Sequence, residues 1–118
     1  MTNSNEELWT SERCFIREIV NSADIQDFSL AETRVEPGMT TELHKLSVKE
    51  WYIILAGEGQ MEIDAKPAHP VVPGDIVSIP AETSQRIHNN GNVDLLFQCV
   101  CLPRFTPECY VSLEKKLS

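Results

Sequence analysis

The sequence is poor in positive charge, with ten Lys and Arg against 18 Asp and Glu and a formal net charge of −8. Nucleic acids and anionic membrane surfaces are bound through clustered Lys and Arg, so neither is an expected partner. Apolar runs are also short, and none approaches the roughly 20 residues that span a bilayer. Residues 1–7 lack the basic and apolar regions of a secretory signal, so we expect a cytoplasmic protein.

The cysteine spacing argues against a zinc site built from cysteines. Of Cys14, Cys99, Cys101 and Cys109, the closest pair is separated by one residue, whereas zinc-binding pairs usually enclose two to four. We therefore expect reduced thiols, most of them buried as small apolar side chains.

Sustained helical periodicity is missing, except in the tail from Pro107 to Leu117, for which we expect a short helix. Short apolar runs alternate instead with Gly, Pro and Asn turns, a pattern typical of an all-β antiparallel sandwich or barrel. The length suits one domain, which we place at residues 14–118 behind a polar arm at residues 1–13. The expected strands are Cys14–Val20, Phe28–Val35, Thr41–Leu46, Trp51–Leu55, Gln60–Ile63, Ala68–Val72, Ile76–Ile79, Gln85–Asn89 and Leu95–Leu102.

Two of these strands, Trp51–Leu55 and Leu95–Leu102, are apolar on both faces. A strand of a small antiparallel protein usually exposes one face to solvent, so both strands need a second cover. A second subunit is one candidate, which predicts a homodimer with an isologous interface. The N-terminal segment folding over these strands is the alternative.

Side chains two apart on a strand share a face, which groups several residues of the segment from Gly38 to Gly57. If the turn at residues 47–49 preserves the alternation, His44, Leu46, Glu50, Tyr52 and Ile54 point the same way. A His and a Glu that converge inside a closed barrel supply two ligands of the kind that Mn, Fe, Ni and Zn accept.

The spacing of these residues resembles the cupin superfamily. Gly38, His44, Glu50 and Gly57 match its first motif, and Gly74, Pro80 and Asn89 match its second. The resemblance covers about residues 28–102, with the core motifs at 38–92. It implies a jelly-roll, or double-stranded β-helix, barrel, often dimeric, with a divalent metal frequently held in the barrel mouth by three His and one Glu.

The chain departs from the family pattern where that metal would bind. Leu46 and Gln85 replace two of the histidines, and Glu82 replaces the second-motif glycine. The resemblance therefore leaves His44, Glu50 and Gln85 as a weaker ligand set for Mn, Fe, Ni or Zn, or as hydrogen-bonding groups with no metal. His88 would join them only if a β-bulge turned it inward.

Further side chains are candidates for the same pocket. Tyr52 shares the face of Glu50, so these two residues are the candidate proton donors and acceptors of any reaction. Cys99 and Cys101 share one face of their strand, and Leu46 and Ile54 would add apolar surface. Arg34 and Arg86 are candidates for binding a substrate carboxylate through a bidentate contact.

Three functions fit these observations. In the first, the chain binds a small molecule in the barrel, with or without a weakly held metal. In the second, it is a metalloenzyme of the dioxygenase, isomerase or lyase type that acts on a small carbonyl-containing or sugar-like substrate. In the third, it is a structural or partner-binding dimer without barrel chemistry. The missing histidines favour binding over metal-dependent catalysis.

Overall fold

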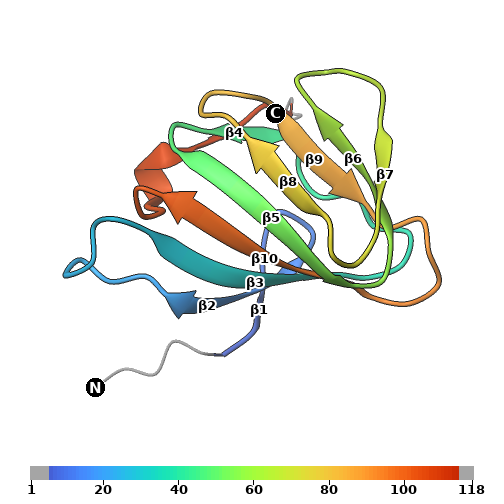
Figure 1. Cartoon of the computed structure of the whole chain (residues 1–118), viewed down its shortest axis with the longest axis horizontal. Coiled ribbons are helices and arrows are strands. Elements are labelled where there is room, and N and C mark those ends of the chain that lie inside the picture. The colour runs from blue at the N-terminus through green and yellow to red at the C-terminus, as the bar shows by residue number, and fades with distance from the viewer. Residues whose placement is uncertain (1–5, 115–118) are drawn as a thin grey trace.

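The computed structural model describes residues 6–114 and consists of two antiparallel β-sheets that pack around a common core (Figure 1). The strand order is β1-β2-β3-β10-β5-β8 in the six-stranded sheet and β11-β4-β9-β6-β7 in the five-stranded sheet. The all-β prediction is confirmed. The strands are β1 (Leu8–Trp9), β2 (Phe15–Val20), β3 (Ser29–Val35), β4 (His44–Leu46), β5 (Lys49–Ala56), β6 (Gly59–Ile63), β7 (His69–Val71), β8 (Ile76–Ile79), β9 (Gln85–His88), β10 (Leu95–Leu102) and β11 (Tyr110–Ser112).

Strands β5 and β10 lie side by side within the larger sheet, with β3 on the other side of β10 (Figure 1). Along β5 the side chains alternate: Glu50, Tyr52 and Ile54 are buried inside the barrel, whereas Trp51 and Ile53 are half-buried on the outer face. The turn before β5 preserves this alternation, because His44 and Leu46 of β4 are buried too. The sequence-based grouping of these five inward residues is therefore confirmed.

The apolar core contains side chains from both sheets. Phe97, Ile54 and Met61 are among its largest members, each at most 1% exposed. A second, smaller cluster consists of Leu46, Val48, Cys101 and Cys109. Members of both clusters also line the cavity described below, so the cavity borders both.

The C-terminal segment differs from its predicted helix. Residues Pro107–Cys109 form a single 3-10 turn, and β11 then pairs with β4, with Tyr110 opposite Leu46 and Ser112 opposite His44. The open edge of β4 explains the difference, because the pairing satisfies its backbone groups. Residues 115–117 of the predicted helix lie outside the described residues.

The N-terminal segment also pairs with the barrel. Leu8 lies opposite Ile16 and Trp9 opposite Phe15, and the Trp9 and Phe15 rings meet edge to face with centroids 5.0 Å apart. Leu8 and Trp9 of the expected arm thus extend the larger sheet at its β2 edge, and Thr10 and Glu12 line the same cavity as the inner faces of β5 and β10. Among residues 6–114, no helix has the length and hydrophobicity needed to cross a membrane.

Two glycines of the first motif provide a matched test of the fold. Gly38 and Gly57 both have positive φ, at +83° and +79°, which disfavours any residue with a Cβ. A Cβ at Gly57 would lie 2.9 Å from the Cα of Leu95 and closer still to the Asp94 carbonyl oxygen, whereas a Cβ at Gly38 meets nothing within 4 Å.

We expect Gly38→Ala to lower the free energy of unfolding by about 1 kcal/mol, the cost of the backbone conformation. Gly57→Ala adds a backbone clash and is expected to cost at least about 2 kcal/mol more. Urea unfolding of both variants measures the difference. Equal losses would contradict the close approach of the β5–β6 turn to the β10 backbone.

Candidate ligand-binding site

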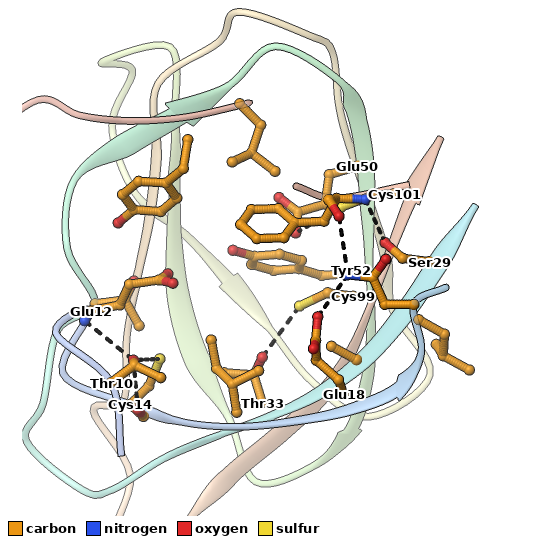
Figure 2. Close-up of a pocket in the computed structure, with 18 of the residues that line it drawn as sticks. Thr10, Glu12, Cys14, Glu18, Ser29, Thr33, Glu50, Tyr52, Cys99 and Cys101 are labelled. Atoms are coloured by element: carbon orange, nitrogen blue, oxygen red, sulfur yellow. Dashed lines mark hydrogen bonds between the residues drawn. The ribbon is translucent and has the colours of Figure 1, made fainter. Parts of the chain in front are cut away.

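A cavity of about 520 Å³ opens between the two ends of the chain and the inner face of the larger sheet (Figure 2). Its walls come from β2, β3, β4, β5 and β10, together with residues before β2 and residues 104–110. Six of the predicted site residues line it, namely His44, Leu46, Glu50, Tyr52, Cys99 and Cys101. The sequence therefore placed six site residues on one cavity.

Glu50 lies on β5 and is 6% exposed. Its Oε2 is 3.8 Å from the Sγ of Cys101, but among the described residues its Oε1 is the one buried side-chain oxygen or nitrogen without a hydrogen-bond partner. Burial raises the pKa of Glu50 to about 7, and the charge of Glu12 adds to the rise, while the Gln85 amide and the two nearby thiols offset part of it. Burial thus favours the protonated form of this carboxyl group more than it would for an exposed glutamate.

His44 presents a neutral imidazole. Its Nδ1 lies 2.7 Å from the backbone carbonyl oxygen of Glu42, so Nδ1 carries the proton and donates it. Burial lowers the pKa of His44, and its ring stacks on Tyr110 with centroids 4.7 Å apart. The second ring nitrogen, Nε2, is therefore left as an acceptor.

Tyr52 and Gln85 are bonded to each other. The Tyr52 hydroxyl donates to Oε1 of Gln85 over 2.7 Å, and both side chains are buried. Burial raises the pKa of Tyr52 well above its usual value. Gln85 does not line the cavity, so its oxygen is engaged with Tyr52 and is not directed at a ligand.

The thiols that face the cavity are protonated. Cys99 Sγ lies 3.3 Å from the hydroxyl of Thr33, and burial raises the pKa of both Cys99 and Cys101 well above the usual range (Figure 2). Cys14, at the same cavity, has its pKa raised to about 12 by burial. All four cysteines are free, in agreement with reduced thiols, and a protonated thiol is a poor nucleophile and metal ligand.

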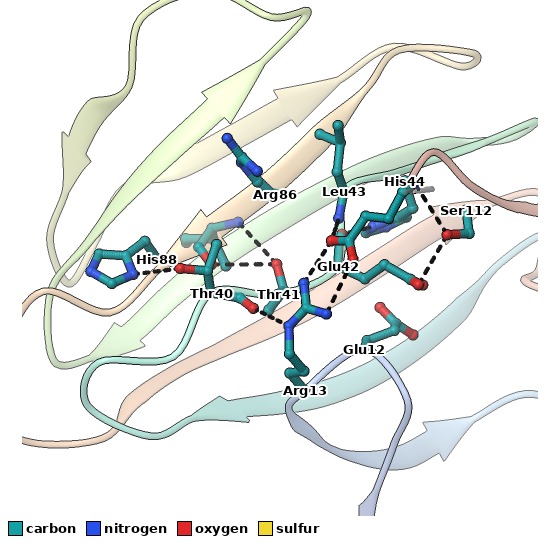
Figure 3. A network of polar contacts seen from close by, with 12 residues as sticks. Glu12, Arg13, Thr40, Thr41, Glu42, Leu43, His44, Arg86, His88 and Ser112 are labelled. Atoms are coloured by element: carbon teal, nitrogen blue, oxygen red, sulfur yellow. Dashed lines mark hydrogen bonds and ion pairs between the residues drawn. The ribbon is translucent and has the colours of Figure 1, made fainter. Parts of the chain in front are cut away.

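Ile54, Arg34 and His88 also lie away from the cavity. Ile54 packs in the apolar core. Arg34 forms ion pairs with Glu7 at 2.9 Å and Asp94 at 3.0 Å, so it is not available to bind a carboxylate in the pocket. His88 lies on the outer face of β9, and its Nδ1 is 2.7 Å from the Thr40 hydroxyl (Figure 3). The β6–β9 pairing has no bulge that would turn His88 inward.

Arg86, the second carboxylate-binding candidate, also points outward. It pairs with Glu62 on the neighbouring strand β6, with Nε 3.0 Å from Oε2. Both predicted arginines are therefore held by carboxylates of the protein itself.

Glu12 is a cavity residue that the sequence analysis missed. It belongs to an alternating run in which Leu8, Thr10, Glu12, Cys14, Ile16 and Glu18 all line the cavity. Burial raises the pKa of Glu12 to about 7, and the charge of Glu42 adds to the rise. Glu12 lies in the turn between β1 and β2, so the period-two rule for extended strands does not predict the direction of its side chain.

A polar network joins Arg13, residues 40–43 and residues 110–114 (Figure 3). Glu42 accepts hydrogen bonds from the hydroxyls of Tyr110 and Ser112. Arg13 pairs with Glu114 at 2.6 Å, and Glu114 also accepts from the backbone N–H of Leu43. These two carboxylates are satisfied within the protein, in contrast to Glu50.

A family model for the cupin domain matches residues 31–101, and the chain belongs to the cupin family. An uncharacterized protein of Methanocaldococcus jannaschii is 41% identical over 68% of this chain and 64% of its own length. The oxalate-binding protein of Thermotoga maritima is 36% identical over 61% of this chain and 60% of its own length. The chain thus spans less than two thirds of either relative.

Solved structures share the fold. A predicted oxalate decarboxylase of Thermotoga maritima superposes with a TM-score of 0.73 and 26% identity, over 83% of this chain and 90% of that chain. The oxalate decarboxylase of Lactobacillus farciminis gives a TM-score of 0.78 at 22% identity, over 92% of this chain and 33% of that chain. These likenesses confirm the cupin barrel.

The divalent metal implied by the family does not fit the side chains at this site. No three His, Cys, Asp or Glu residues in the described part of the chain are grouped so that they could hold a metal ion. Leu46 supplies no donor atom, and the Gln85 oxygen already accepts from Tyr52. A carboxyl and one imidazole are too few ligands for Mn, Fe, Ni or Zn.

Restoring the two family histidines tests this conclusion. We expect untagged wild-type protein to retain less than about 0.1 equivalent of Mn, Fe, Ni or Zn after dialysis. The double variant Leu46→His, Gln85→His should bind about one equivalent, because the two new histidines complete a set of three imidazoles and one carboxylate. Elemental analysis measures both. Near-stoichiometric metal in wild-type protein that is lost in Glu50→Gln would contradict the conclusion.

Proposed function

We propose that this protein binds a small organic molecule in the barrel cavity directly through its side chains, without a metal. The observation that supports the proposal is Glu50, which lines the cavity and whose buried Oε1 has no hydrogen-bond partner among the described residues. A buried polar group without a hydrogen bond costs about 1–3 kcal/mol, so such groups in native proteins usually receive a partner from elsewhere. A ligand that donates a hydrogen bond would supply it.

The relatives support a small-molecule ligand. One is named for binding oxalate, and another, from Vibrio campbellii, is named L-ectoine synthase and is 24% identical over 83% of this chain. The cavity volume of about 520 Å³ lies within the range of about 300–1,000 Å³ that is usual for such ligands.

Proton transfer to or from the bound molecule is the second candidate function. A carboxyl group with a pKa of about 7 is suited to exchange protons at neutral pH, and Glu50 would be that group. Tyr52 is a weaker candidate for proton transfer than Glu50, because its hydroxyl group already donates its proton to Gln85.

Protein-observed NMR tests ligand binding without knowledge of the ligand. We expect members of a fragment library of mixed charge to shift the backbone amide signals of Glu50, Cys99 and Cys101. Ala31→Leu should abolish these shifts, because Ala31 lines the cavity and the larger side chain occupies it.

Ala56→Leu is the matched control, since Ala56 is exposed at the end of β5 and outside the cavity wall. Unchanged spectra with every fragment, or equal shifts in Ala31→Leu, would contradict cavity binding.

We also propose a homodimer through the outer face of β5, β8 and β10. Ile76 and Leu55 on this face are 66% and 40% exposed, and Ile76 lies opposite Ile53 in the strand pairing. The N-terminal strand β1 lies at the opposite edge of the sheet, and Thr10 and Glu12 line the cavity on its inner face, which leaves these apolar residues of the outer face exposed. A self-complementary apolar sheet face favours an isologous dimer.

Sedimentation velocity tests the dimer. Wild-type protein is expected to sediment as a dimer at micromolar concentration, and Ile76→Lys as a monomer with an unchanged melting temperature, because the change places a charge in the interface but not in the core. Val93→Lys serves as the control, since Val93 is 59% exposed in the loop before β10. A monomeric wild-type protein would overturn the proposal.

A further inference from the structure

The charged side chains around the cavity are mostly negative. Three glutamates line it, Glu12, Glu18 and Glu50, against one basic residue, Arg104. Glu18 accepts a hydrogen bond from the Asn21 amide, and Arg104 donates to the Asn21 oxygen over 2.8 Å, so this group is satisfied internally. Among the described residues, no ion pair is found for Glu12 or Glu50.

The hydrogen-bond donors that line the cavity are largely used within the protein. The hydroxyls of Tyr52 and Tyr110 donate to Gln85 and Glu42, and that of Thr10 donates to the Cys14 carbonyl oxygen. The acceptors are in a different state, because Oε1 of Glu50 has no partner within residues 6–114 and Nε2 of His44 carries a lone pair. The cavity therefore favours a ligand that donates hydrogen bonds.

Aromatic rings form much of the remaining wall. The rings of Tyr52 and Phe97 pack together with centroids 4.4 Å apart, and the ring of Tyr110 stacks on that of His44. All four residues line the cavity. Ring faces attract ammonium groups, and the attraction grows when water is excluded. Carboxylates combined with aromatic faces favour a cation over an anion of the same size.

We infer that the ligand of this cavity is a small organic amine, bound as its ammonium ion by the Glu12 and Glu50 carboxylates with His44 Nε2 as a further acceptor. This inference rests on the proposed function, since it names the chemical class of the molecule that the cavity holds. An ammonium group supplies the donor that Glu50 Oε1 lacks and places positive charge between two unpaired carboxylates. A small dicarboxylate such as oxalate would meet like charge there.

Three probes of one shape and different charge test the inference: benzylamine, benzyl alcohol and benzoate. Isothermal titration calorimetry on the full chain at pH 8 is expected to show binding of benzylamine at least tenfold tighter than that of either analogue. Glu50→Gln and Glu12→Gln should each weaken benzylamine binding at least tenfold, because a hydrogen bond to a charged group contributes about 1.5–3 kcal/mol.

Glu36→Gln is the matched control, since Glu36 is exposed in the turn after β3 and should leave all three affinities unchanged. A native-like NMR spectrum of each variant separates lost binding from lost structure, and the Glu12 variant keeps the test valid if the Glu50 variant fails to fold. Benzoate or benzyl alcohol binding as tightly as benzylamine would overturn the amine while leaving cavity binding intact. The amine inference would also be overturned if none of the three probes binds while fragments of other classes shift the cavity amide signals. If no fragment of any class shifts these signals, the proposed function itself fails.

Discussion

The Glu50 carboxyl group lies inside the barrel, and one of its oxygens has no hydrogen-bond partner in the part of the chain that the structure describes. Its position follows from the alternation of β5, which turns Glu50 and Tyr52 inward and Trp51 outward. Burying an ionised carboxylate without a partner is costly, so the group holds its proton more tightly and its pKa rises. The surrounding cavity is consistent with this constraint, because it leaves room for a molecule that completes the hydrogen bonding.

The same fold holds a different site when two side chains change. Leu46 and Gln85 occupy positions where the cupin pattern has histidines, and Gln85 bonds to Tyr52 instead of facing the cavity. Removing two imidazoles removes the metal ligands but keeps the glutamate, which then becomes an unpaired acceptor. The ligand chemistry of this protein is therefore determined by its side chains and not by the barrel that it shares with the oxalate decarboxylases.

Much of the fold was accessible from the sequence, because turns and alternation are local. The nine predicted strands are all present, and the inward grouping of His44, Glu50 and Tyr52 follows from parity alone. The pairing of β11 with β4 was not predictable in this way, since the charge order of the tail suited a helix and only the open edge of β4 favours a strand. The Tyr52–Gln85 bond and the Arg34–Asp94 ion pair join residues at least 33 positions apart, and no local pattern reveals such partners. Glu12 had no such local signal, because it lies in the turn between β1 and β2, and the polar composition of the segment suggested an unpaired arm.

The most direct test of the unpartnered Glu50 is its pKa in the ligand-free protein. Carbon-13 NMR of the glutamate side-chain carboxyl signals, with Glu50→Gln to assign the resonance, measures it across pH 4 to 9. Burial without a partner predicts a midpoint of about 7. A midpoint at or below the ordinary value of 4.5 would show that the carboxylate is already paired in the free protein, and would contradict the account.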